Sequence, residues 1–169
     1  MRLRWQQLLI GGDIMAEFVY NEIQLVQANQ PVLLEDSIPC NKGYVYHRNG
    51  SGNLILRGIT PNCFARYQVT FNGNIAVPSD GTAGPIAIAL AIDGEPILTS
   101  RAIATPAAVA PVGPTTENYF NVTSTAIVTV PRGCCFSLSV ENVSQGATSA
   151  DPAPAINVQN ANVTVTRIA

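Results

Sequence analysis

Residues 65–72, ARYQVTFN, place apolar side chains at every second position and polar side chains between them. A period of two is typical of a β-strand with one face in a hydrophobic core. Residues 86–92, IAIALAI, alternate large and small apolar side chains, so we expect cover on both faces, by the core and by either a loop or a neighbouring subunit. From Glu17 onward no stretch sustains a helical stripe, which predicts an all-β chain.

Turn signals divide the rest of the chain into short extended runs. Asn49-Gly50-Ser51-Gly52 predicts a hairpin, and Asp93-Gly94 predicts a turn into a strand at 96–99. A second hairpin is expected between 120–130 and 134–140. About eight to ten strands at this spacing indicate a sandwich, barrel or jelly roll, among which spacing alone does not choose.

The length and composition fit one domain. With 169 residues, 47% hydrophobic and 12% charged, the chain can bury a core without metals or disulfides. A net charge of -2 without a basic run argues against nucleic acid and membrane surfaces as partners, and no stretch predicts membrane insertion. So few charges favour a surface partly buried against identical copies, although a weakly charged monomer is the alternative.

The first fourteen residues are expected to be foreign to the domain. Residues 1–10 are too short and too polar for an export signal or a membrane span. Codons for residues 11–14 can spell a bacterial ribosome-binding sequence ahead of Met15. We therefore expect 1–14 to be a non-native leader from an upstream start, with a short arm as the alternative, and 15–169 to be the single domain.

A search for chemistry finds no catalytic, cofactor-binding or metal site. His47 lies beside a predicted hairpin turn, where a solvent-exposed role is expected, and no nucleophile elbow accompanies it. Carboxylates at Asp80, Asp93 and Asp151 are expected to be solvated loop residues and not calcium ligands. The cysteines, Cys40, Cys63, Cys134 and Cys135, lack zinc spacing and are expected to be reduced, partly buried thiols. We expect no enzyme.

Five strings in order carry a family resemblance from about Leu54 to the C-terminus. They are residues 67–71 (YQVTF), 88–96 (IALAIDGEP), 125–133 (TAIVTVPRG), 136–138 (FSL) and 160–168 (NANVTVTRI). Together they resemble the C1q/TNF-like jelly roll, especially the versions in Firmicutes surface proteins and their bacteriophages. The fibre-head members follow a collagen segment, and no Gly-X-Y repeat is present here.

The resemblance implies an antiparallel jelly-roll sandwich that forms a compact homotrimer. In that family one sheet of each protomer packs around a threefold axis through apolar and aromatic residues. The positions that match are Tyr67, Val69 and Phe71, with Phe120, Val122 and Phe136 as further candidates.

Two functions follow as expectations. The first is a non-enzymatic virion protein of a bacteriophage, a head decoration or fibre that binds a capsid protein and stabilises the particle or mediates adhesion. The alternative is a receptor- or glycan-binding head on a bacterial cell or spore surface. In that case the predicted surface loops 104–117 and 144–154 would carry the specificity.

Overall fold

The computed structural model describes residues 15–38, 43–113 and 115–169, and nearly all of its regular structure is β-strand. The expected leader, 1–14, and Cys40 lie outside the described residues. Within the described ranges, the helical structure is one three-residue 3-10 helix, η2 (Leu98–Ser100). No helix in that part of the chain is long and apolar enough to span a membrane.

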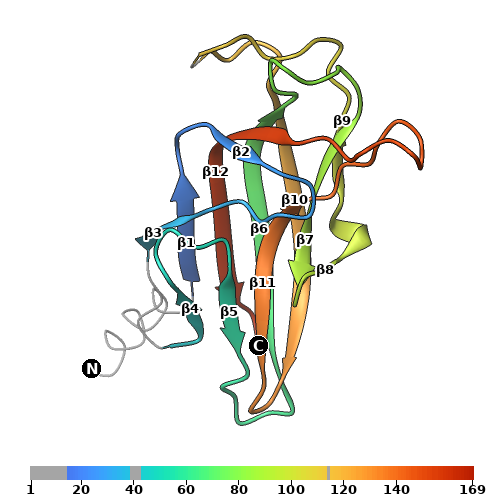
Figure 1. Ribbon diagram of the computed structural model, residues 1–169. Helices are drawn as coiled ribbons and strands as arrows, with labels where there is room; N and C mark the ends of the chain where they lie inside the picture. The colour runs from blue at the N-terminus through green and yellow to red at the C-terminus, as the bar shows by residue number, and fades with distance from the viewer. Residues whose placement is uncertain (1–14, 39–42, 114) are drawn as a thin grey trace.

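Two antiparallel sheets face each other as the layers of a sandwich (Figure 1). The strands of sheet A are β1 (Met15–Tyr20), β2 (Gln24–Val26), β3 (Glu35–Ile38), β6 (Phe64–Ala76), β10 (Phe120–Pro131) and β12 (Ile156–Arg167). The strands of sheet B are β4 (Val45–His47), β5 (Leu54–Arg57), β7 (Ile86–Ile92), β8 (Glu95–Pro96), β9 (Ala102–Ala104) and β11 (Cys135–Asn142).

The strand order is that of a jelly roll. Sheet A runs β10-β6-β12-β1-β3 with β2 also on β12, and sheet B runs β4-β5-β11-β7-β8 with β9 also on β7. The predicted all-β sandwich is confirmed. The strands beyond the expected eight to ten are pieces of two or three residues such as β8 and β9, too short to give a sequence period.

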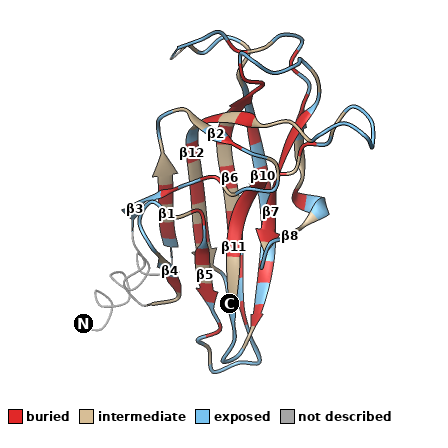
Figure 2. Cartoon of the chain, viewed as in Figure 1, coloured by how far each residue is buried: buried red, intermediate tan, exposed pale blue. Residues whose placement is uncertain are grey.

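The core lies between the sheets, and strand alternation builds it. Ala65, Tyr67, Val69 and Phe71 on β6 are all fully buried, as their period of two predicts. Full burial of a side chain such as Val69 or Phe71 stabilises the fold by about 1.5–3 kcal/mol. Figure 2 shows buried residues along the strands of both sheets and exposed ones in the turns and long loops.

Strand β7 is covered on both faces by its own chain. Ile86, Ile88 and Leu90 belong to the core. The alanines between them are equally inaccessible, at 0–1% exposed, although no second subunit is present. A loop or neighbouring subunit was expected to cover this face, and the structure shows that the same chain suffices.

Two predicted turns are confirmed, and one predicted strand is corrected. Strands β4 and β5 pair as a hairpin, with Gly50 at φ +82° between them. Asp93 and Gly94 both take positive φ, at 51° and 81°. Beyond that turn the predicted strand at 96–99 ends at Pro96, and η2 follows. The Ser100 hydroxyl accepts from the Leu90 amide at 3.0 Å, in place of a continuing strand partner.

The predicted hairpin between 120–130 and 134–140 is wrong. Strand β10 pairs with β6 in sheet A, whereas β11 pairs with β5 and β7 in sheet B. The turn after Pro131 therefore crosses from one sheet to the other. Because Val130 and Leu138 face the same core from opposite sheets, both are fully buried, and the local pattern is the same for a hairpin and for this crossing.

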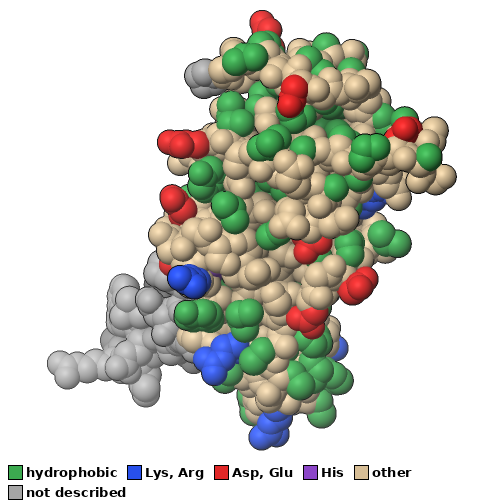
Figure 3. All heavy atoms as spheres, viewed as in Figure 1, with side chains coloured by type: hydrophobic (Ala, Val, Ile, Leu, Met, Phe, Trp, Pro, Cys, Tyr) green, Lys and Arg blue, Asp and Glu red, His purple; other side chains and the backbone are tan. Residues whose placement is uncertain are grey.

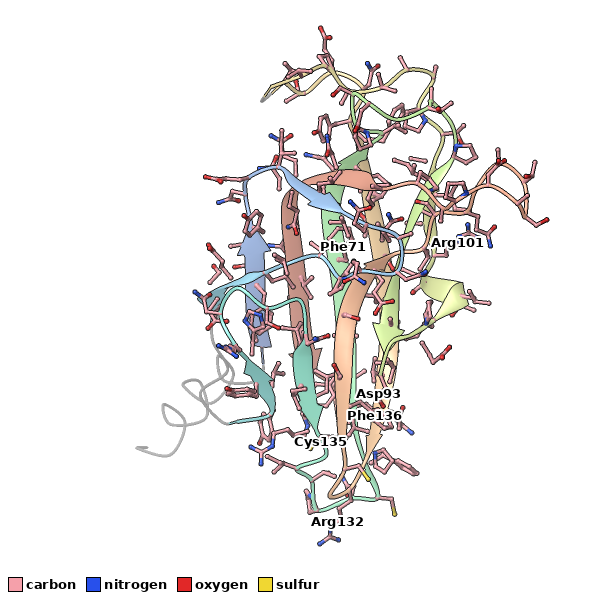
Figure 4. All side chains as sticks on the ribbon, in the orientation of Figure 1. Phe71, Asp93, Arg101, Arg132, Cys135 and Phe136 are labelled. Carbon is pink, nitrogen blue, oxygen red and sulfur yellow. The ribbon has the colours of Figure 1, made fainter. Side chains whose placement is uncertain are left out.

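The expectation of partly buried cysteines is also corrected. Cys63, Cys134 and Cys135 are free and exposed within the described part of the chain. They lie where the β10–β11 crossing meets the start of β6, and Figure 4 shows Cys135 and Arg132 at this end of the sandwich. Local turn geometry, not strand alternation, decides the exposure of residues this close to a chain reversal.

Candidate functional site

The outward side of sheet A carries a broad set of uncharged polar side chains, which we call the polar face. It arises directly from alternation, because the positions between the buried apolar residues point away from the core. The polar face consists of Gln68, Thr70, Asn72 and Asn74 on β6, Asn121, Thr123, Thr125 and Thr129 on β10, and Asn162, Thr164 and Thr166 on β12.

Amide and hydroxyl side chains cross-link β6 and β10 on this face. The Asn72 amide donates to Asn121 Oδ1 at 3.0 Å and to Thr123 Oγ1 at 2.8 Å. Asn121 in turn donates to Asn74 Oδ1 at 3.0 Å, and Thr70 and Thr125 approach to 3.2 Å between hydroxyl oxygens. Cross-strand pairs of this kind stabilise a sheet and hold its side chains in fixed positions.

The bonding continues across β12 to β1. Asn162 donates to Glu17 Oε1 at 2.6 Å, and the Thr164 hydroxyl donates to Asn162 Oδ1 at 3.2 Å. A bulge interrupts the β6–β12 register between Gln159 and Asn162, where Asn160 takes φ +53°. The side-chain hydrogen bonding therefore reaches the Glu17 carboxylate of β1, which borders the polar face.

The polar face holds very little charge. Among the outward residues of β6, β10 and β12, all of which lie in the described part of the chain, Arg66 alone is charged. The neighbouring strands of sheet A carry carboxylates beyond this face, Glu17 on β1 and Glu35 and Asp36 on β3. Partial burial raises the pKa of the nearby Tyr119 phenol, against the opposing effect of its hydrogen bond with Asn157, so Tyr119 stays neutral at physiological pH. Ile127, 62% exposed, adds an apolar side chain. Such a surface loses little hydration energy on contact with another protein.

Four of the predicted interface residues point into the protomer core and not toward a second copy. Tyr67, Val69 and Phe71 are fully buried between the sheets, and Val122 is 8% exposed. Figure 4 shows Phe71 within the sandwich. The strand is the one expected near the axis, but its apolar residues already fill the protomer core. These four side chains are therefore not available to contact a second copy.

The other two predicted interface residues separate. Phe120 begins β10 and is 43% exposed, so it remains available at the rim of sheet A. Phe136 lies on β11 of sheet B, opposite Leu56, and packs partly against the core. The structure does not bring these two residues together with the polar face as one site.

The polar face was not among the predicted sites, because its residues alternate as those of any half-buried strand do. A signal was present in the triplets Asn121-Val122-Thr123 and Asn162-Val163-Thr164. They lie on β10 and β12, the two strands that flank β6 in sheet A. Only the strand order shows that these repeats share one face.

His47 is buried and structural, which corrects the expected exposed role. Its side chain is 1% exposed, with Nδ1 against the Asp36 carboxylate and Nε2 2.9 Å from the Ser51 carbonyl oxygen. Its ring packs edge-on against Phe18, with centroids 4.9 Å apart. Both ring nitrogens are thus engaged with fixed oxygens.

In the described ranges, no group of three or more His, Cys, Asp or Glu side chains could hold a metal ion.

Comparisons with known proteins place the fold. No protein-family model and no curated protein matches the sequence. The globular domain of zebrafish complement 1qA superposes with a TM-score of 0.51 at 14% identity, covering 92% of this chain and 96% of that one. Eiger TNF from S. frugiperda superposes with a TM-score of 0.58 at 12% identity, covering 92% of each chain. The fold is a C1q/TNF-like jelly roll.

This assignment chooses the jelly roll among the three architectures that strand spacing left open. A C1q/TNF-like jelly roll is the fold that the five ordered strings resembled, so the expectation about fold is confirmed. At 12–14% identity the likeness concerns the fold alone.

Proposed function

We propose that this chain is a non-enzymatic, homotrimeric structural module of a bacteriophage particle, a head decoration or fibre, and that its protomers meet through the polar face. The observation that carries the proposal is the polar face on β6, β10 and β12, nearly uncharged and hydrogen-bonded, on a C1q/TNF-like jelly roll. The resemblance of the sequence to trimeric domains supports three as the number of copies.

The chemistry of the polar face suits contact with identical copies. Burying an unpaired charge is expensive, whereas amides and hydroxyls that already bond one another lose little when water leaves. The symmetry of a trimer brings the same surface to the axis three times, so a charged face would repel itself. The low charge of the whole chain, 12%, agrees with this use.

A single substitution tests the assembly. Thr125→Arg puts a charge in the middle of the polar face and removes its contact with Thr70. Wild-type protein is expected to scatter light as a trimer at micromolar concentration, and the variant as a folded monomer. The control is Thr116→Arg, in the exposed loop before β10, which is expected to stay trimeric. A monomeric wild type, or a T125R variant that remains a trimer, would refute the proposal.

The virion role has its own test. Mass spectrometry of purified particles from the native host is expected to detect this chain among the structural proteins. Its detection only in the cell-wall or spore-coat fraction would support the alternative, a receptor- or glycan-binding head. One observation supports the receptor- or glycan-binding alternative: the 143–155 loop lines a hollow.

A further inference from the structure

The loop between β11 and β12 stands away from sheet B and encloses a hollow of about 630 Å³. Figure 1 shows this loop projecting from the sandwich beside η2. Ligand sites for small molecules commonly have volumes of about 300–1,000 Å³. The hollow is lined by Asn29, Pro96, Leu98, Arg101, residues 143–149, Asp151 and Ala153.

Hydrogen bonds at its base hold the loop open. The buried Asn142 amide donates to the carbonyl oxygens of Val26 at 3.0 Å and Pro154 at 2.9 Å, which ties the two ends of the loop together. The Ser144 hydroxyl accepts from the Ala87 amide at 2.9 Å. Gly146 packs so closely that an added Cβ would lie 2.3 Å from the Asp151 carbonyl oxygen. The hollow is therefore preformed, which lowers the entropy cost of binding.

Arg101 faces this space without an anion. It follows η2, and Figure 4 shows it beside the projecting loop. It also lines a second hollow of about 190 Å³. Its Nε is buried without a hydrogen-bond partner, and no ion pair engages it within the described ranges.

The nearby carboxylates are already engaged. Asp151 Oδ2 accepts from the amide and the hydroxyl of Thr148, at 3.0 and 2.9 Å. Buried Glu141 accepts from the Ser139 hydroxyl at 2.8 Å. These bonds lie within their own turn and strand, so the guanidinium of Arg101 retains its capacity for an external carboxylate.

Further polar residues line the hollow. Asn29, Gln145, Thr148 and Ser149 bring amide and hydroxyl groups to it. Such groups can bond the hydroxyls of a small ligand. The lining contains no aromatic ring on which a neutral sugar could stack.

We propose that this hollow binds a small carboxylate-bearing, hydroxyl-rich molecule of the size of an acidic monosaccharide. Arg101 pairs with the carboxylate, and the amide and hydroxyl side chains around it bond the hydroxyls. A single arginine matches a single negative charge, and charge replaces the missing aromatic platform. Every lining residue belongs to one chain, so the site does not require the trimer.

Calorimetric titration of the full chain tests the proposal with three probes: glucuronate, glucose and acetate. Glucuronate is expected to bind saturably in the millimolar range, acetate more weakly because it lacks hydroxyls, and glucose not at all. Arg101→Gln is expected to weaken glucuronate binding about ten- to a hundredfold, the usual worth of a charge-assisted bond. Arg132→Gln, at the far end of the sandwich (Figure 4), is the matched control and is expected to bind as the wild type does.

The outcomes decide the matter. The proposal would be overturned if glucuronate binding did not saturate, if glucose bound as tightly as glucuronate, or if R101Q bound glucuronate as tightly as R132Q does. If acetate bound as tightly as glucuronate, the proposed role of the hydroxyls would be overturned. Light scattering of R101Q is expected to match the wild type. Failure of the ligand site is therefore distinguishable from failure of the trimer, which the polar-face variant reports.

Discussion

A single phenol joins the two sheets at one end of the sandwich. Tyr67 of sheet A is fully buried, and its hydroxyl lies within hydrogen-bond distance of the carbonyl oxygens of Tyr44, just before β4, and Arg57, the last residue of β5. The guanidinium of Arg167 lies over the Tyr44 ring, 4.3 Å from its centroid. At the residue scale, this cluster explains why an aromatic residue with a polar tip stands in an otherwise apolar row.

Tyr67→Phe is expected to lower the free energy of unfolding by about 1–2 kcal/mol, because it removes the hydrogen bonds of a fully buried phenol to the Tyr44 and Arg57 carbonyl oxygens. Urea denaturation measures this as a lower midpoint with an unchanged slope. Tyr46→Phe, at a 60% exposed side chain, is the control and is expected to change stability by less than about 0.5 kcal/mol. Equal midpoints for the two variants would contradict the inter-sheet role.

At the scale of elements, the crossing from β10 to β11 is held by backbone contacts with the β5–β6 connection. Gly58 donates to the Cys134 carbonyl oxygen at 2.8 Å and accepts from the Gly133 amide at 3.0 Å. A Cβ added at Gly58 would lie 2.0 Å from the Pro131 carbonyl oxygen. The chain changes sheets at a place where only glycine permits this approach.

Gly58→Ala is expected to destabilise the protein by at least about 2 kcal/mol, since backbone must move to admit the methyl group. Thermal unfolding followed by circular dichroism measures the loss. Gly84→Ala is the matched control, because an added Cβ would lie 4.0 Å from its nearest neighbour, the Thr82 carbonyl oxygen, and this variant is expected to unfold near the wild-type temperature. Similar melting temperatures for both variants would show that the crossing tolerates the displacement.

At the scale of the whole molecule, surface chemistry separates the two sides of the sandwich. The polar face on β6, β10 and β12 is a hydrogen-bonded surface with very little charge, whereas the side seen in Figure 3 carries scattered acidic and basic groups without a patch of one sign. The proposed trimer uses the first side, and the proposed ligand hollow lies beside sheet B. The two functions can therefore coexist in one assembly.

The proposed trimer is expected to persist from about 0.1 M to about 1 M NaCl, because an interface with few charges offers little for salt to screen. Light scattering across that range measures the mass. Dissociation at high salt would show that ion pairs hold the copies together and would move the interface away from the polar face.

Particular residues show what could be anticipated about the site. The inward row of β6 was predictable, because in a half-buried strand with a period of two the apolar residues all face the core. The interface residues were not, because apolar side chains such as Phe71 serve the protomer core as readily as a contact between subunits. Arg101 gave no sequence signal, because its unsatisfied state depends on a loop more than forty residues further along the chain.

The sequence by itself determined the all-β class, the tight turns at Gly50 and Gly94, and the identity of the buried positions on β6, because these depend on contacts between near neighbours. Only the tertiary structure decided that β10 and β11 belong to different sheets, that Asn72 and Asn121 share one face, and that Arg101 lacks an anion. The physical reason is that alternation specifies which side of a strand is buried, whereas the partner of that strand is chosen by the packing of the whole chain.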